Sequence, residues 1–178
     1  MQTDPENDII ARVKSGAADE FEHLVHRYQG ALFRIVGNLV DGSRVEDVVQ
    51  DVFLAAFVNL HRFDPRRGSF RTWIYRIARN HALNAKKKRR ERLFDKDPVM
   101  ADPHTPCQDL IVKQAFERLD RTLGELDVKD RLIFVLSELE GLSYAEIAQV
   151  EKLPLGTVKS RLSRVRDKLR RSLRKHME

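Results

Sequence analysis

Apolar residues recur at spacings of three and four along most of this chain, a pattern that predicts amphipathic helices. The first half of the sequence indicates one short helix followed by longer ones. These helices are expected over residues 6–14, 19–39, 43–60 and 69–90. Asp19 and Ser69 are suitable N-cap residues, and Ser43 followed by Glu46 has the spacing of a capping box. Because no segment shows the strict alternation of a β-strand, the predicted fold class is all-α.

The helical periodicity stops over residues 94–108, where three prolines fall among several aspartates. Such a stretch is typical of a flexible linker. The helical pattern resumes near Asp109 and continues in a further helix over residues 128–139. We therefore expect two small helical domains, residues 1–93 and 109–178, on either side of this linker.

Residues 142–176 have the pattern of a helix-turn-helix. Ser143 and Glu146 form another capping box, and Pro154 suits the first turn of a second helix. The inner face of that second helix carries the apolar residues Val158, Leu162, Val165 and Leu169. Its other faces are rich in Lys and Arg, which predicts a helix that enters the major groove of DNA. The alternative is a two-helix hairpin with a solvated basic face.

A second basic segment, residues 63–88, interleaves aromatic, cationic and amide side chains. Its members are Phe63, Arg66, Arg67, Phe70, Arg71, Trp73, Tyr75, Arg76, Arg79, Asn80, Asn84, Lys86 and Lys87. Cations follow a phosphate backbone, rings stack on unpaired bases and amides bind base edges, which is the chemistry of single-strand binding. The alternative places Phe70, Trp73 and Ile77 in the core, and for Trp73 and Ile77 the two roles are equally open.

The net charge of +6 is distributed unevenly along the chain. Counting Lys and Arg against Asp and Glu, the net charge is −5 in residues 1–60, +9 in 61–100, −5 in 101–150 and +7 in 151–178. Two basic regions predict two contacts with a polyanion, and each acidic region suggests a surface for another protein. Hydrophobic residues make up 42% of the chain, which is enough to form a core.

No catalytic constellation, phosphate-binding loop or cofactor motif emerges from the sequence, so we expect no enzyme activity and no cofactor. His23 and His26 share a helix face, but no third ligand lies near them in sequence, and no metal site is expected.

Cys107 is the only cysteine, which excludes an intrachain disulfide and fits a reducing cytosol. No stretch approaches the roughly 20 apolar residues of a membrane span, and the acidic start is unlike a signal peptide. Membrane insertion is therefore not expected, and the predicted location is cytoplasmic.

Short motifs occur in a specific order along the chain. They are Ala18–Glu22 with Tyr28, Val45–Phe53, Arg62–Asp64, Phe70–Ala78 with Asn80, Gly141–Ala148 and Gly156–Leu162. In this order and spacing they resemble the extracytoplasmic-function (ECF, group IV) branch of bacterial sigma factors, in the sigma-70 family. The resemblance covers residues 8–173. It implies a promoter-specificity subunit of RNA polymerase, with a region 2-like domain, a region 4-like helix-turn-helix domain and no turnover of its own.

The same resemblance implies contacts with proteins. The helix that contains residues 47–53 would dock on the clamp coiled coil of the polymerase β′ subunit. Its contact residues would be Asp47, Gln50, Asp51 and Phe53. The β flap of the polymerase core and an inhibitory anti-sigma factor are further implied partners.

It also implies contacts with promoter DNA, both duplex and single-stranded. At the −10 element the chain would melt the duplex and capture flipped non-template bases through Phe63, Phe70, Arg71, Trp73, Tyr75, Arg76, Asn80, Asn84 and Lys87. At the −35 element the side chains nearest the bases would be Lys159, Ser160, Ser163 and Arg164. Those nearer the phosphates would be Thr157, Arg161, Arg166 and Lys168.

The sequence departs from the family pattern at Lys152, where many sigma factors have glycine. Lys152 is therefore expected to adopt a left-handed conformation, unless the turn itself differs.

The sequence leaves two alternative functions open. One is a stand-alone helix-turn-helix regulator whose first domain senses a ligand or dimerises, which leaves the acidic helix over 46–51 and the basic segment after it unexplained. The other is an enzyme with a metal site at His23 and His26.

Overall fold

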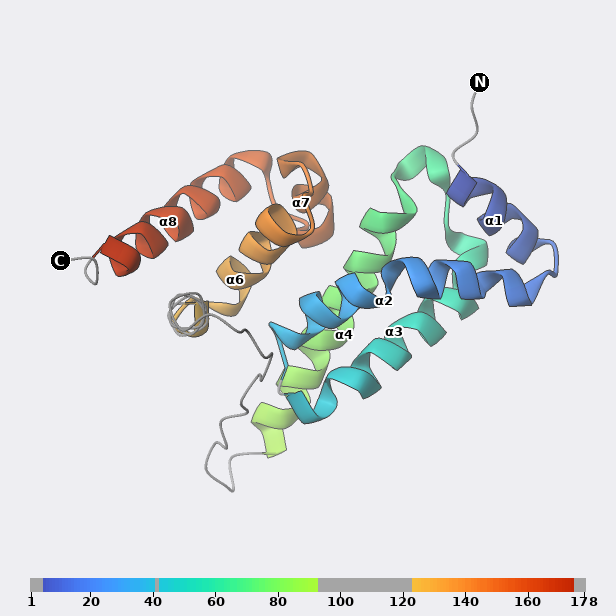
Figure 1. Ribbon diagram of the computed structural model, residues 1–178, viewed down its shortest axis with the longest axis horizontal. Coiled ribbons are helices and arrows are strands. Elements are labelled where there is room, and N and C mark those ends of the chain that lie inside the picture. The colour runs from blue at the N-terminus through green and yellow to red at the C-terminus, as the bar shows by residue number, and fades with distance from the viewer. Residues whose placement is uncertain (1–4, 41, 93–122, 175–178) are drawn as a thin grey trace, which may run out of the picture. The chain divides into compact units, whose positions relative to one another are not determined.

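The computed structural model describes residues 5–40, 42–92 and 123–174, and all regular elements among these residues are helical (Figure 1). The predicted all-α fold is confirmed. The chain divides into two compact units between Met100 and Ala101. The linker predicted over 94–108 and most of the helix expected after Asp109 lie outside the described residues.

In the first unit, helices α2, α3 and α4 pack against one another, and α1 packs on α2 (Figure 1). The elements are α1 Pro5–Lys14, η1 Ala18–Glu20, α2 Phe21–Gly37, η2 Gly42–Arg44, α3 Val45–Val58, η3 Leu60–Arg62, η4 Pro65–Arg67 and α4 Phe70–Arg92. Their apolar stripes meet in a core that includes Leu24, Leu32, Ile35, Val52 and Ile74, all with no exposed surface. The spacing of apolar residues therefore predicts the helices of this unit well.

In the first unit, the predicted helix starts are confirmed at one place and wrong at two. Ser69 caps α4, because its Oγ accepts a hydrogen bond from the Thr72 N–H at 3.2 Å. The capping box predicted at Ser43 and the cap predicted at Asp19 do not form. Asp19 and Ser43 each lie in a 3₁₀ turn that runs directly into the next helix. The N-cap positions of α2 and α3 are therefore Glu20 and Arg44, which have near-helical dihedrals and make no side-chain cap bond. An N-cap side chain reaches its N–H partner from an extended backbone, which these turns do not provide.

Aromatic side chains form the centre of the first unit. Tyr28 from α2 contacts Phe70 and Tyr75 from α4 in edge-to-face geometry, with ring centroids 5.5 and 6.1 Å apart. The Tyr28 hydroxyl donates to the buried Glu6 carboxylate of α1 at 2.6 Å, and Arg27 Nε lies 3.5 Å from the same oxygen. Burial is the larger cause of the raised pKa of Tyr28, and the hydrogen bond to Glu6 is the second. One ring thus connects α1, α2 and α4.

The second unit contains α6 Val128–Phe134, the π-helical segment η6 Val135–Leu139, α7 Tyr144–Glu151 and α8 Leu155–Arg174 (Figure 1). The helix predicted over 128–139 is confirmed, and its second half widens into η6. Asp127 caps α6 by accepting from the Lys129 N–H at 3.3 Å. Helices α6 and α7 both pack on α8. The contact face of α8 is the predicted apolar stripe, whose members Val158, Leu162, Val165 and Leu169 are all buried.

Helices α7 and α8 form the predicted helix-turn-helix. Ser143 Oγ accepts from the Glu146 N–H at 3.3 Å, and Glu146 Oε2 accepts from the Ser143 N–H at 2.8 Å, which completes the capping box. Lys152 ends α7 in the left-handed conformation, with φ 54° and ψ 45°. It is the only non-glycine residue with positive φ in the described part of the chain. Of the two possibilities left open for this turn, the structure has the left-handed one.

Replacing Lys152 with glycine should stabilise the second unit. A left-handed residue with a Cβ costs about 1–2 kcal/mol, and the greater freedom of glycine in the unfolded chain offsets about 0.5–1 kcal/mol of that gain. We expect Lys152→Gly to raise the free energy of unfolding by about 0.5–1 kcal/mol, measured by hydrogen exchange of the core amides in α7 and α8. Lys152→Ala removes the same charge but keeps the Cβ, so it should give no such gain. Equal stabilisation by both variants would assign the effect to charge and not to the backbone.

Candidate nucleic-acid interface

The outer face of α8 presents a small cluster of polar side chains. Lys159, Ser160, Ser163 and Arg164 are all exposed and lie opposite the buried stripe of the same helix. Arg164 Nε donates to the Ser160 carbonyl one turn earlier, at 3.4 Å. Because these four residues lie within the first half of a helix that follows the turn, they have the placement of base-reading residues in a recognition helix. The structure brings together the four residues predicted to lie nearest the −35 bases.

The other cations of α8 contact groups within the second unit. Arg161 Nη1 donates to Asp130 Oδ1 of α6 at 2.9 Å, and Lys168 Nζ donates to the Glu125 carbonyl at 3.0 Å. Thr157, the fourth residue expected near phosphate, is half-buried. These side chains therefore have contacts within the unit, and their expected place near the DNA phosphates stays a prediction.

Arg166 makes the most extensive of these internal contacts. Its guanidinium donates to Glu138 Oε1 at 2.6 Å and to the Tyr144 hydroxyl at 3.0 Å, which joins α8 to η6 and α7. The bonds to Glu138 and then Tyr144 raise the pKa of Arg166. The side chain therefore holds the helix-turn-helix together, a role that sequence spacing did not indicate.

The first unit contains an open cleft of about 400 Å³ between the end of α3 and the middle of α4. Its lining residues are Ala55, Asn59, Arg62, Trp73, Arg76, Ile77, Asn80, His81 and Asn84. Four of the residues predicted to act at the −10 element meet here: Trp73, Arg76, Asn80 and Asn84. A cleft of this volume lies within the range of small-ligand sites.

The side chains of the cleft combine three kinds of chemistry. Trp73 and Ile77 offer apolar surface, Arg62 and Arg76 offer positive charge, and the asparagines offer amide donors and acceptors. Asn80 Oδ1 accepts from Arg79 Nη1 at 3.1 Å. This combination suits an unpaired base attached to a phosphate chain.

Sequence reasoning missed Ala55, Asn59, Arg62 and His81, which also line the cleft. Ala55 and Asn59 come from the end of α3, and only the packing of α3 on α4 brings them to the site. Arg62 did carry a sequence signal, because it lies immediately before the aromatic and basic segment.

Three aromatic residues predicted to contact the −10 strand are core residues instead. Phe63, Phe70 and Tyr75 are only 4%, 1% and 3% exposed. Phe63 and Phe70 pack against each other with centroids 5.5 Å apart, so their faces are already covered. Arg71 is half-buried and Lys87 is exposed, and neither lines the cleft. The prediction of base stacking is thus restricted to Trp73, which is half-buried.

A third surface runs along the outer side of α3. Asp47, Gln50 and Asp51 are exposed, as expected for polymerase contacts, whereas Phe53 is half-buried. The same helix face continues in exposed apolar residues: Leu54 at 61%, Phe57 at 39% and Val58 at 60%. Phe57 is partly covered, because its ring contacts Phe21 with centroids 5.1 Å apart. The spacing of Leu54 and Val58 from Gln50 and Asp51 was the available signal for this stripe.

The histidines of α2 do not form a metal centre in the described part of the chain. His26 Nε2 lies 3.1 Å from Glu22 Oε1, and within the described ranges no group of three or more potential ligands occurs. In the same residues, no helix is both long and apolar enough to cross a membrane.

Comparisons with known proteins agree with this geometry. The family described as Sigma-70 region 2 matches residues 24–92, and the family described as Sigma-70, region 4 matches residues 116–169. The ECF RNA polymerase sigma factor SigW of Bacillus subtilis is 31% identical over 93% of this chain and 95% of its own length. The ECF RNA polymerase sigma-E factor of Escherichia coli K12 is 35% identical over 89% of each chain.

A solved structure extends the likeness to three dimensions. The sigma factor RpoE in complex with the anti-sigma factor NepR, from Bartonella quintana, has a TM-score of 0.76 and 25% identity over 87% of this chain and 97% of that one. This chain belongs to the ECF RNA polymerase sigma factors of the sigma-70 family. Proteins of this family are DNA-binding factors for promoter-specific transcription initiation that associate with RNA polymerase and are not themselves catalysts.

Proposed function

We propose that this chain binds RNA polymerase core, directs it to promoters through −35 and −10 elements, and promotes melting at the −10 element. The observation that carries the proposal is the presence of two unlike nucleic-acid surfaces on one chain. The outer face of α8 suits a duplex groove, whereas the cleft between α3 and α4 suits an extruded base. A stand-alone regulator needs only the first of these surfaces.

At the −35 element, Lys159, Ser160, Ser163 and Arg164 contact bases. Their exposure and their position near the start of α8 support this assignment. Arginine recognises guanine through a bidentate contact, so Arg164 contributes the largest share of the discrimination. Arg161, Arg166 and Lys168 act mainly by holding α8 on the rest of the unit.

At the −10 element, a non-template base leaves the duplex and enters the cleft. Trp73 and Ile77 contact the face of the base, while Asn80 and Asn84 bind its edge. Arg62 and Arg76 neutralise the neighbouring phosphates. A flipped base exposes its hydrogen-bonding edge, which is why melting and recognition occur in one step.

The polymerase surface consists of Asp47, Gln50, Asp51, Leu54 and Val58 on α3. Its acidic end suits a basic partner, and its apolar end supplies area that loses water on binding. The partner is the clamp coiled coil of the β′ subunit, with the second unit docked on the β flap. These partners place the chain in the cytoplasm.

An anti-sigma protein that covers the polymerase surface would act as an inhibitor. The relative solved with its anti-sigma factor supports a partner of this kind.

Reversing a charge on this surface should weaken core binding. We expect Asp51→Arg to reduce affinity for core polymerase by several kcal/mol, because a like charge then faces a basic partner. Glu22→Arg on α2 is the matched control, since it makes the same charge change at an exposed site on another helix. Fluorescence titration with core polymerase measures both variants, and thermal unfolding checks that Asp51→Arg folds. Promoter binding by the free chain at the same affinity as the holoenzyme would favour a stand-alone regulator instead.

Removing Arg164 should relax base selection at one position. We expect Arg164→Ala to cost about 1–3 kcal/mol of discrimination at a single −35 base pair, measured as holoenzyme binding to a library of −35 variants. Arg170→Ala, at an exposed site farther along α8, should leave the preference unchanged.

Arg166→Ala should instead lower the stability of the second unit by about 1 kcal/mol, through loss of its contacts with Glu138 and Tyr144. Base-selective loss in Arg166→Ala but not in Arg164→Ala would mean that α8 is rotated in the groove.

Removing Asn80 should slow promoter opening. We expect Asn80→Ala holoenzyme to bind duplex promoter normally but to open it more slowly, with permanganate reactivity of unpaired thymines as the readout. A template premelted at −10 should recover most of the rate, because the unstacking cost of a few kcal/mol is then already met. Gln29→Ala, an exposed amide on α2, serves as the control. Equal defects on duplex and premelted templates would assign Asn80 to folding.

A further inference from the structure

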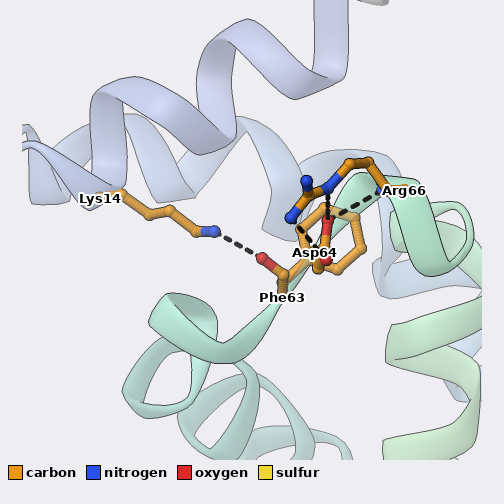
Figure 2. A network of polar contacts seen from close by, with 4 residues as sticks. All are labelled: Lys14, Phe63, Asp64 and Arg66. Carbon is orange, nitrogen blue, oxygen red and sulfur yellow. Dashed lines mark hydrogen bonds and ion pairs between the residues drawn. The ribbon is translucent and has the colours of Figure 1, made fainter.

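The loop over residues 63–69 connects Arg62, on one side of the cleft, with α4, which carries the other side. Lys14, the last residue of α1, contacts the first residue of this loop. Its Nζ donates to the Phe63 carbonyl at 2.6 Å and lies 5.7 Å from the centroid of the Phe63 ring (Figure 2). The two residues are 49 positions apart in the sequence.

Phe63 is the residue at which the backbone leaves η3. It has φ −69° and ψ 128°, and its N–H donates to the Leu60 carbonyl at 3.0 Å. Its buried ring lies 5.6 Å from the ring of Trp73, which lines the cleft. Other residues already hold the ring and the N–H of Phe63. The hydrogen bond from Lys14 fixes the remaining polar group of Phe63, its carbonyl. Lys14 therefore sets the direction in which the chain enters the loop.

The rest of the loop is built on that start. Asp64 accepts from the Arg66 N–H at 3.0 Å and from the Arg66 guanidinium at 3.2 Å, which closes η4 (Figure 2). The side-chain bond and then the backbone bond from Arg66 hold the pKa of Asp64 below its usual range. The side chain of Arg66 is 89% exposed although it is bonded to Asp64, and the side chain of Arg67 is also exposed. At the other end, Ser69 caps α4.

Helix α1 is itself firmly attached to the first unit. Glu6 accepts from Tyr28, and the Arg12 guanidinium makes two bonds of 2.9 Å to the Glu20 carboxylate. Both contacts hold α1 against the α2 region, and neither involves the loop. The match to Sigma-70 region 2 begins at residue 24, so Lys14 lies outside it.

We propose that Lys14 is a positioning residue for the 63–69 loop, and that through this loop it keeps the two sides of the cleft in the geometry that captures a melted −10 base. The inference rests on the proposed function of the cleft. Lys14 acts through the Phe63 carbonyl and does not need to touch DNA. Its loss should affect promoter opening without affecting recruitment to the duplex.

The test uses holoenzyme formed from the full chain and core polymerase, on a promoter fragment that wild-type holoenzyme retains from genomic DNA. Lys14→Met keeps the side-chain length and removes the donor. We expect it to slow opening of the duplex about tenfold, the low end for loss of a charge-assisted hydrogen bond. Lys14→Arg keeps a cationic donor and should recover most of the rate. A template premelted at −10 should also recover most of the rate, which a general folding defect would not allow.

Arg12→Met is the matched control, because it removes one cation and one anchor from the same helix without touching the loop. It should stay within about twofold of wild type. Normal opening by Lys14→Met, or equal slowing by Arg12→Met, would overturn the proposal. Asn80→Ala, measured in parallel, separates the two hypotheses. If Asn80→Ala is slow and Lys14→Met is not, only the role of Lys14 fails, whereas normal opening by Asn80→Ala removes the proposed function of the cleft as well.

Discussion

The contact between Tyr28 and Phe70 is the interaction on which the first unit depends. It joins α2 to α4 through an edge-to-face pair, and Phe63 of the loop also packs against Phe70. Trp73 lies against both Phe63 and Phe70, with centroids 5.6 and 5.4 Å away, so the apolar side of the cleft is an extension of this cluster. The Tyr28 hydroxyl in turn holds Glu6 and with it α1. The surface proposed to bind a single base thus rests on packed core residues, and a preorganised site needs such support.

The two units manage their polar side chains differently. In the first unit, cations and amides remain accessible around an open cleft. In the second, Arg161, Arg166 and Lys168 contact acidic or carbonyl groups of neighbouring segments and tie a small core together. A unit with little buried area gains from such contacts, because its apolar core alone supplies limited stability. The face of α8 that we propose for DNA is correspondingly narrow.

Local patterns predicted the helices and the capping box at Ser143, because each depends on residues within a few positions of one another. The left-handed Lys152 was one of two possibilities that the family resemblance left open. Local patterns did not separate Tyr75, which is buried, from Trp73, which lines the cleft, because that difference is made by Tyr28 on another helix. The partners of Arg161 and Arg166 lie 31 and 28 positions away, beyond any local signal. Leu54 and Val58 continued the polar stripe of α3 at the right spacing, but their apolar character indicated burial. For these two residues the apolar side chain indicated burial, whereas the position on the helix indicated exposure. In the structure both side chains are exposed.

The proposed role of α8 gives its internal ion pairs a further consequence, for how the chain distributes itself in a cell full of DNA. Each cation that reaches a phosphate releases a counterion, and this release supplies most of the affinity for arbitrary sequence. With Arg161, Arg166 and Lys168 already paired, fewer counterions are released when α8 meets an unrelated site. The genome offers an enormous excess of such sites, so a modest loss of affinity at each keeps a larger share of the chain in solution. For a factor that acts only after joining a much larger enzyme, that free fraction determines how quickly the two find each other.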